Sequence, residues 1–268
     1  MSLRVKHFGD NFVIAQGRAG YPGIGLDVFL YNVDGLLIDT GPWNLAEDIK
    51  PFLLAFSPRK VVITHLHEDH CGLAFWINAV YPDTPIYVHE RCIEAASVEA
   101  KLPLYRRIFW GRRRPFRAKP YPSDAIETDR YSFKIFHVGG HSEDHIFLYE
   151  PDRGWLFVGD LFLTTRPIAV FYEEKAYQTI EALRLMLSLD FSDLFCSHSG
   201  HHPNGRELIA KKKEYLEMLQ DKVRDLKARG YSIADIDRIL FPKKPFITRI
   251  SRGEWSSMNI LKTLEPAG

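Results

Sequence analysis

The chain has 268 residues, of which 46% are hydrophobic, 26% charged and 13% aromatic, and its formal net charge is +1. This composition excludes a disordered chain, a collagen and a coiled coil, and the length suits one large domain with or without a small appendage. No apolar run approaches the roughly 18–20 residues of a membrane helix, and the first residues lack the hydrophobic core of a secretory signal. Three cysteines are too few for a disulfide framework, so we predict a cytoplasmic protein without a membrane partner.

The N-terminal third is predicted to consist of short strands and turns with two helices. Asp34-Gly35 lies between two apolar runs and favours a tight hairpin, because both residues tolerate a positive φ. Asn44, with Glu47 three residues later, is typical of a helix N-cap. We expect strands over 11–16, 26–32, 36–39, 60–64 and 86–88, and helices over 44–56 and 71–79.

The rest of the chain alternates strands and helices after an interruption. Residues 91–123 break the pattern and are predicted to form a helical or irregular insertion. Beyond it we expect strands over 132–138, 146–150, 155–158 and 194–197, and helices over 173–189, 205–229 and 232–240. Gly230 is placed to end the penultimate helix, and Ser232 with Asp235 to begin the last one. This order predicts a layered α/β (α+β) protein.

Residues 64–72 read Thr-His-Leu-His-Glu-Asp-His-Cys-Gly and carry the strongest chemical signal in the chain. His65, His67, Asp69 and His70 are side chains of the types that bind metals, and they directly follow a predicted strand. Imidazole and carboxylate donors together suit zinc. A loop after a strand lets such groups converge on one point, so we predict a metal site here.

Three further candidates stand just past the ends of other predicted strands. His141 follows the strand over 132–138 and two glycines, Asp160 follows the strand over 155–158, and His198 follows the strand over 194–197. Open α/β sheets place their sites at the carboxyl ends of strands. Each residue alone is a weak signal, but the three together with the first cluster predict ligands for more than one ion.

Five motifs now stand in order along residues 10–200. They are Leu37-Ile-Asp39-Thr-Gly41, Thr64-His-Leu-His-Glu-Asp-His70, Gly140-His141, Phe157-Val-Gly-Asp160 and Ser197-His198-Ser-Gly200. This set resembles the metallo-β-lactamase fold superfamily. The resemblance implies a four-layer αββα sandwich as a catalytic domain over 1–204, with a helical extension over 205–268.

The resemblance also implies a role for each motif residue. His65, His67 and His141 would bind a first metal ion, Asp69, His70 and His198 a second, and Asp160 would bridge the two. Asp39 would hydrogen-bond a ligand histidine and so fix its tautomer. The cofactors would be two divalent metal ions, with zinc favoured and iron or manganese as alternatives.

A mechanism follows from this ligand set. Two adjacent cations lower the pKa of a bridging water, and the resulting hydroxide would attack a carbonyl or phosphorus. Asp69 would be catalytic by orienting this nucleophile. We therefore expect a hydrolase of a small, anionic ester, thioester, lactone or phosphoester. The alternatives are a nucleic-acid phosphodiesterase or ribonuclease, and an iron-dependent redox enzyme of the same fold, against which His67 argues. The oligomeric state is left open.

The leaving-group acid is not determined by the motifs. His201, His202 and Tyr172 are the candidates, and we take His201 and Tyr172 as candidate substrate contacts as well. His145 is expected to be a hydrogen-bonding residue rather than a ligand. Cys71 and Cys196 lie near ligands in sequence, but we expect both to be small buried residues.

Hydroxyacylglutathione hydrolases resemble the chain in the Gly159-Asp160-Leu161-Phe162 element and in the helical C-terminal part. Their last ligand usually stands in a Gly-His-Glu context, which differs from Ser197-His198-Ser199. The resemblance is therefore specific for the fold and the metal site, and not for the substrate.

Residues 100–123 contain no acidic side chain. The stretch holds eight cationic residues, Lys101, Arg106, Arg107, Arg112, Arg113, Arg114, Arg117 and Lys119, and five aromatic ones, Tyr105, Phe109, Trp110, Phe116 and Tyr121. Three interpretations stay open: a lid that selects an anionic small molecule, a nucleic-acid surface with stacking aromatics, and a structural helix pair. We predict a lid, with Arg112, Arg113 and Arg114 in contact with an anionic substrate, and nucleic acid as the less favoured partner.

Overall fold

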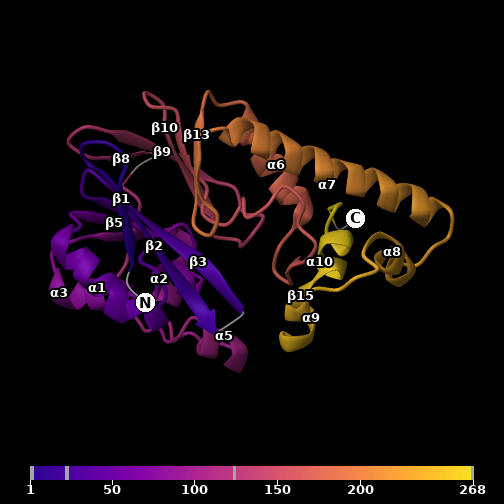
Figure 1. Ribbon diagram of the computed structural model, residues 1–268, viewed down its shortest axis with the longest axis horizontal. Helices are drawn as coiled ribbons and strands as arrows, with labels where there is room; N and C mark the ends of the chain where they lie inside the picture. Colours follow the sequence, from indigo (N-terminus) through magenta and orange to yellow (C-terminus); the bar gives the residue numbers. More distant parts are fainter. Residues whose placement is uncertain (1–2, 22–23, 123–124, 267–268) are drawn as a thin grey trace.

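The computed structural model describes residues 3–21, 24–122 and 125–266. Two β-sheets face each other, and helices cover the outer face of each sheet (Figure 1). The four layers are therefore helix, sheet, sheet and helix, which confirms the predicted fold class. The only additional sheet within these residues is a two-stranded one.

The first sheet contains seven strands that pair in sequence order. They are β1 (Arg4–His7), β2 (Phe12–Tyr21), β3 (Ile24–Val33), β4 (Leu36–Ile38), β5 (Lys60–Val62), β6 (Ile86–Val88) and β7 (Lys119–Pro120). Strands β1 to β4 are antiparallel, whereas β4 to β7 are parallel. Asp34 (φ 49°) and Gly35 (φ 81°) make the tight turn between β3 and β4, as the sequence predicts.

The second sheet contains six strands in the order β14–β13–β11–β10–β9–β8. Their bounds are β8 (Ala125–Glu127), β9 (Ser132–His137), β10 (Ile146–Glu150), β11 (Trp155–Phe157), β13 (Asp193–Cys196) and β14 (Gly200–His202). Only β11 and β13 are parallel neighbours among these strands. A separate pair joins β12 (Val170–Phe171) to β15 (Trp255–Ser256), which connects the C-terminal residues to the main sandwich.

The helices fall into three groups. Against the first sheet lie η1 (Trp43–Leu45), α1 (Ala46–Ala55), α2 (Glu68–Cys71) and α3 (Ala74–Val80). The insertion contributes η2 (Glu90–Cys92), α4 (Ile93–Ala96) and α5 (Leu104–Phe109). Against the second sheet lie α6 (Ala176–Leu187) and the long α7 (Gly205–Ala228), followed by α8 (Ile233–Leu240), α9 (Phe246–Ile250) and α10 (Ser257–Lys262) (Figure 1). No helix within the described ranges is long and apolar enough to cross a membrane.

Three hydrophobic cores lie between the four layers. Side chains of a strand alternate between its two faces, and in β2 Phe12 and Ile14 enter the core between the sheets while Val13 and Ala15 enter the core beneath α1. Phe157 of β11 and Phe195 of β13 stack in the core between the sheets, with ring centroids 4.6 Å apart. The third core joins α6, α7, α8 and α10 to the outer face of the second sheet.

Most predicted elements are present with ends shifted by a few residues. The strands expected over 86–88 and 146–150 have these bounds in the structure. Gly230 adopts a positive φ just after α7, and the Ser232 hydroxyl accepts a hydrogen bond from the Asp235 amide at the start of α8, as predicted. The insertion is helical and irregular as expected; its last predicted residue, Ser123, lies outside the described residues.

Two helix predictions are wrong in detail. Asn44 does not cap the first helix, because its side-chain amide donates hydrogen bonds to the carbonyls of Ile108 and Phe109 instead, and Leu45 occupies the N-cap position. The helix expected over 71–79 is divided into α2 and α3. The boundary between the domains predicted over 1–204 and 205–268 stays a prediction; α7 shares its core with α6 and the second sheet.

Replacing Phe157 with alanine is expected to lower the free energy of unfolding by about 3–5 kcal/mol, because the side chain is 1% exposed and its loss leaves a cavity between the sheets. The matched control is Phe246→Ala, since Phe246 is 60% exposed and its truncation should change stability by less than about 0.5 kcal/mol. Chemical denaturation followed by circular dichroism measures both. Equal losses in the two variants would contradict the assignment of the core.

Candidate metal centre

The predicted ligands meet at one edge of the sandwich. Strands β4 and β5 are parallel in the first sheet, and β11 and β13 are parallel in the second, so the chain leaves each pair on the same side. Asp39 follows β4, the segment 64–70 follows β5, Asp160 follows β11 and His198 follows β13. The loop between β9 and β10 adds His141.

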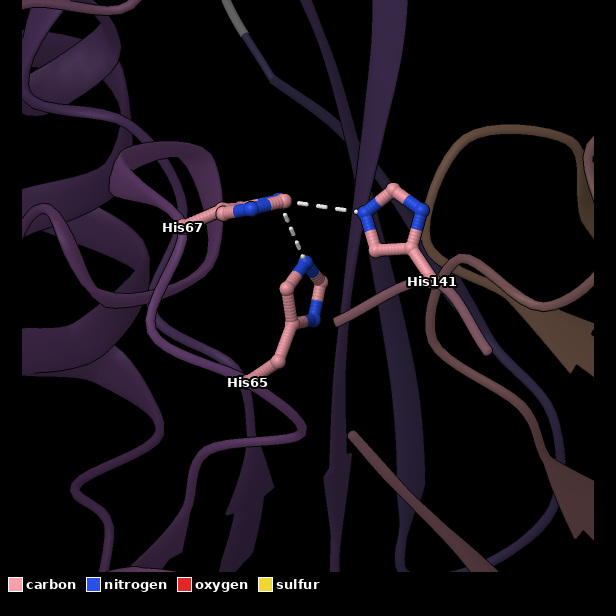
Figure 2. A group of neighbouring side chains, drawn as sticks. All are labelled: His65, His67 and His141. Atoms are coloured by element: carbon pink, nitrogen blue, oxygen red, sulfur yellow. Dashed lines mark hydrogen bonds between the residues drawn. The ribbon is translucent and has the colours of Figure 1, made fainter. Parts of the chain in front are cut away.

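Three histidines form the first group of candidate ligands. The Nδ1 atom of His67 lies 3.0 Å from Nε2 of His65 and 3.1 Å from Nε2 of His141 (Figure 2). The rings of His65 and His141 point their Nε2 atoms toward the same position beside His67 (Figure 2). His65 and His141 are buried, and His67 is partly buried.

Two aspartates and two histidines form the second group: Asp69, His70, Asp160 and His198, all buried. The Nε2 atom of His198 lies 3.1 Å from an Asp69 oxygen and 3.3 Å from an Asp160 oxygen. Nε2 of His70 lies 3.4 Å from the other Asp160 oxygen. Asp160 also lies 3.6 Å from Nε2 of His141, so its carboxylate stands between the two groups.

These spacings fit a metal ion in each group. Around a tetrahedral zinc ion with bonds of about 2.1 Å, neighbouring donor atoms lie about 3.4 Å apart. Nε2 of His70 and one oxygen of Asp160 are buried and have no hydrogen-bond partner among the described residues. Buried polar atoms without a partner are costly, and a cation between them removes that cost. Imidazole and carboxylate are also the donor types that zinc accepts.

The outer nitrogens of three histidines lie within hydrogen-bond distance of an oxygen, and those of His67 and His141 face a glutamate at longer range. Nδ1 of His70 lies 2.7 Å from Asp39, Nδ1 of His198 lies 2.7 Å from the carbonyl of Asp27, and Nδ1 of His65 lies 3.1 Å from the Thr64 hydroxyl. Nε2 of His67 lies 3.9 Å from Glu173, and Nδ1 of His141 lies 3.5 Å from Glu174. A proton held on each outer nitrogen leaves a lone pair on the nitrogen that faces the group.

Asp39 has the backbone geometry of a constrained functional residue. Its φ is +58°, a left-handed conformation uncommon outside glycine. Its carboxylate accepts hydrogen bonds from the Thr64 amide at 2.8 Å and from the hydroxyl of Ser197 at 3.3 Å, besides the contact with His70. The carboxylate therefore links β4, β5 and β13 at the point where the ligands leave the sheets.

Burial and charge shift the pKa values within the centre in opposite directions. Burial holds the pKa of His65 well below its usual value, which keeps this ring neutral. Burial opposes protonation of His70 and His198 too, but the nearby carboxylates, above all Asp160, raise both pKa values well above the usual value. The second group therefore binds protons tightly, and a cation of higher charge can displace them.

His145 and the two buried cysteines stay outside both groups. The Asp160 amide donates a hydrogen bond of 3.1 Å to Nε2 of His145, so His145 holds the backbone of the Asp160 loop. Cys71 donates its Sγ hydrogen to the His67 carbonyl, and Cys196 donates to the Phe162 carbonyl. Both are free, buried thiols, and neither belongs to a group of candidate metal ligands.

The candidate substrate contacts are not gathered at the ligands. Arg113 is buried and donates to the Ala95 carbonyl, Arg112 lies 3.5 Å from Glu99, and the Arg114 guanidinium lies over the Trp43 ring. His201 lies 2.5 Å from Asp193 at the start of β13 and stacks on Phe195. Tyr172 is exposed at the rim and donates its hydroxyl hydrogen to Glu173.

Two acidic contacts beyond Asp39 are not predicted from the sequence. Glu173 and Glu174 follow β12 and face His67 and His141, and His67 lowers the pKa of Glu173 to about 2. Two adjacent glutamates before a helix are the only signal that the sequence offers for them. Nothing in the sequence links these residues to histidines more than 30 positions away.

A buried ion pair of the motif with the insertion is also not predicted from the sequence. Arg106 of α5 donates two hydrogen bonds, of 2.7 and 2.6 Å, to the carboxylate of Glu68. Glu68 is 1% exposed, and the Arg106 guanidinium lies over the Phe171 ring at 4.8 Å. The Trp110 ring, just beyond α5, lies 5.8 Å from the ring of His198. The insertion therefore contacts the candidate metal centre through Trp110 and the motif beside it through Arg106.

A model of the metallo-beta-lactamase superfamily matches residues 28–198. The chain belongs to this superfamily. It is 26% identical over 135 residues to the "Probable metallo-hydrolase YybB" of Bacillus subtilis, with 50% of this chain and 59% of the relative covered. It is 25% identical over 201 residues to a hydroxyacylglutathione hydrolase of Legionella pneumophila, with 73% and 65% covered. The chain thus spans less than two thirds of the length of these relatives.

Solved structures of the superfamily share the fold at low sequence identity. A beta-lactamase domain protein from Burkholderia ambifaria aligns with a TM-score of 0.70 and 17% identity, covering 96% of this chain and 87% of that one. A metallo-beta-lactamase family protein from Thermus thermophilus aligns with a TM-score of 0.66 and 16% identity, covering 95% and 91%. These superfamily structures confirm the αββα architecture that the motifs predict.

Replacing Asp39 with asparagine is expected to weaken zinc binding about 10- to 100-fold, because the His70 tautomer loses its charged partner. Asparagine tolerates a positive φ, so the backbone is preserved. Asp34→Asn is the matched control, since Asp34 also has a positive φ (49°) but lies in the β3–β4 turn. Competition with a chromogenic chelator measures the affinity. Equal affinities in both variants would exclude this role for Asp39.

Replacing Arg106 with methionine is expected to lower the free energy of unfolding by about 3–5 kcal/mol, because it leaves the Glu68 carboxylate buried without a partner. The double variant Arg106→Met/Glu68→Leu should recover most of the loss. Arg112→Met is the control, since the Arg112 and Glu99 side chains are 57% and 55% exposed and such pairs contribute less than about 1 kcal/mol. Denaturant titration of the four proteins measures the effect, and no recovery in the double variant would show that the pair is not coupled.

Proposed function

We propose that the chain is a dinuclear metal-dependent hydrolase, with zinc as the favoured metal. One observation carries the proposal: seven donor atoms from separate parts of the chain converge in two adjoining groups. His65, His67 and His141 would hold one ion, and Asp69, His70 and His198 the other. Asp160 would contact both, because its carboxylate stands between the groups.

The donor set and its surroundings define what the site can do. Two divalent cations held there would supply Lewis-acid polarisation of a substrate oxygen and ionisation of water near neutral pH. Asp69 has one carboxylate oxygen near His198 and would orient the attacking water. Glu173 and Glu174 face the outer nitrogens of His67 and His141 and would favour protons there, and Tyr172 at the rim would contact the substrate.

The proposed substrate is a small, anionic ester, thioester, lactone or phosphoester. The name of the Legionella pneumophila relative, hydroxyacylglutathione hydrolase, supports an acyl substrate with an anionic carrier. The contacts of Arg106 with Glu68 and of Trp110 with His198 place α5 beside the centre, which supports a small molecule that enters there. An iron-dependent redox enzyme is the rival proposal, and metal analysis separates the two.

Protein loaded with zinc is expected to contain two ions per chain and to hydrolyse members of an ester, thioester and phosphodiester panel. Asp160→Ala should hold fewer than two ions and lose more than about 100-fold in kcat/KM, because the bridge also screens repulsion between the cations. Asp152→Ala, in the exposed β10–β11 turn, is the matched control. Elemental analysis and steady-state kinetics measure both quantities.

Two outcomes would contradict this proposal. Unchanged metal content in Asp160→Ala would remove the bridging role of Asp160. One tightly bound iron per chain that resists exchange for zinc would contradict the hydrolase proposal and favour the iron-dependent redox enzyme.

A further inference from the structure

The outer face of α5 carries two adjoining hollows. One has a volume of about 330 Å³ and is lined by Trp43, Leu104, Arg107, Ile108, Arg112 and Arg114, among others. The second, of about 600 Å³, shares Arg107 and Arg112 with the first and adds Lys101. Because Arg107 and Arg112 line both hollows, the two lie side by side, and we call them together the α5 groove.

The charge of the α5 groove is strongly positive. Lys101, Arg107, Arg112 and Arg114 line it, whereas Glu99, which lies 3.5 Å from Arg112, is the one acidic residue in either lining. The side chains of Lys101 and Arg107 make no hydrogen bond or ion pair in the described part of the chain. The planar guanidinium groups of arginine bind phosphate oxygens in pairs, so accessible arginines in a groove suit a phosphate.

The aromatic residues of the insertion are absent from the lining of this groove, and three of them have other neighbours. Tyr105 donates its hydroxyl hydrogen to Glu254, Trp110 lies beside His198, and Phe116 is 5% exposed. The exposed apolar residues of α5 are instead Leu104 and Ile108. A single-stranded nucleic acid needs exposed rings on which its bases stack. Trp43 is the one aromatic residue in either lining, and the Arg114 guanidinium lies over its ring. The groove therefore favours a small phosphorylated molecule with an apolar part over a nucleic acid.

The groove and the metal centre lie on two sides of the same helix. Arg106 faces Glu68 in the metal-binding motif, whereas the next residue, Arg107, lines the groove. An α-helix with its side chains is about 10 Å across. A ligand that occupies both places must therefore carry its phosphate about 10 Å or more from the bond that is cleaved.

We propose that the α5 groove binds the phosphate groups of an extended acyl ester or thioester whose acyl carbon lies at the metal centre. This inference rests on the proposed function for the reaction itself. In that reaction water adds to the acyl carbon, the carbon–sulfur or carbon–oxygen bond breaks, and the thiol or alcohol leaves with a proton. Arg107 and Arg112 supply the charge that selects the phosphorylated substrate, and Arg113, which is buried, takes no part.

A matched pair of thioesters tests the groove. Hexanoyl-coenzyme A carries phosphates far from its thioester, and hexanoyl-N-acetylcysteamine has the same thioester without them. The variant Arg107→Ala/Arg112→Ala is expected to lose about 10- to 100-fold in kcat/KM for the first substrate, mainly through KM, because two charge-assisted contacts are removed. The second substrate should change less than twofold. Arg117→Ala, exposed in the same insertion but outside the groove, is the control and should behave as the parent protein.

Equal effects of the double variant on both thioesters would overturn the inference while leaving the proposed function intact. Binding of desulfo-coenzyme A, which has no thioester, is measured by calorimetry and does not depend on hydrolysis. Binding that weakens at least tenfold in the double variant supports the phosphate site in the α5 groove. If no thioester is cleaved in the same experiments, only the proposed thioester hydrolysis is contradicted. A different result would overturn the inference and assign the groove to nucleic acid. In that case desulfo-coenzyme A does not bind, and a 20-nucleotide oligouridine binds in a salt-sensitive manner that the double variant loses.

Discussion

Each histidine of the metal centre can offer a lone pair to it only if its proton stays on the other ring nitrogen. The structure meets this constraint with hydrogen-bond partners at three outer nitrogens: a hydroxyl for His65, a carboxylate for His70 and a backbone carbonyl for His198. Glutamates lie 3.9 Å and 3.5 Å from the outer nitrogens of His67 and His141. These oxygens come from β3, from the ends of β4 and β5 and from the segment after β12. The ligand geometry is therefore a product of the whole sandwich and not of the motif alone.

Each of the two sheets contains a pair of parallel strands, and these pairs explain how oxygens from distant parts of the sequence come together at the candidate metal centre. Strands β4 and β5 end side by side in one sheet, and β11 and β13 do so in the other. The core between the sheets, centred on rings such as Phe157 and Phe195, fixes the distance between these two edges. Asp39 has a left-handed backbone conformation and accepts hydrogen bonds from residues at the ends of strands in both sheets. The local backbone strain is therefore compensated by contacts that hold the candidate ligands in place.

Local patterns explain why the sequence predicts the ligands and most strands. Asp160 and His198 follow short apolar strands. The end of a strand fixes the position of the next residue, so this position depends little on the conformation of the loop that follows. Contacts that depend on distant packing are not predictable in this way. Asn44 has the pattern of an N-cap, yet its amide donates to carbonyls about 64 residues away. Arg106 and Glu68 pair only because α5 folds back over the motif.

The basic insertion over residues 100–123 shows that the sequence also does not predict which charged side chains are accessible. Its eight cations look alike in the sequence, but the structure divides them by position: Arg113 is buried against a carbonyl, Arg106 neutralises Glu68, and Arg107 lines the surface groove. Side-chain direction around one short helix decides which of them can meet an anion. Composition predicts a positive surface, and only the packing of α5 shows where on that surface a ligand fits.

X-ray absorption at the zinc edge of the zinc-loaded protein tests the two-metal centre most directly. We expect nitrogen and oxygen donors only, the outer-shell scattering of several imidazole rings, and a metal–metal contribution. A sulfur donor from Cys71 or Cys196, or an isolated ion without a metal neighbour, would contradict it.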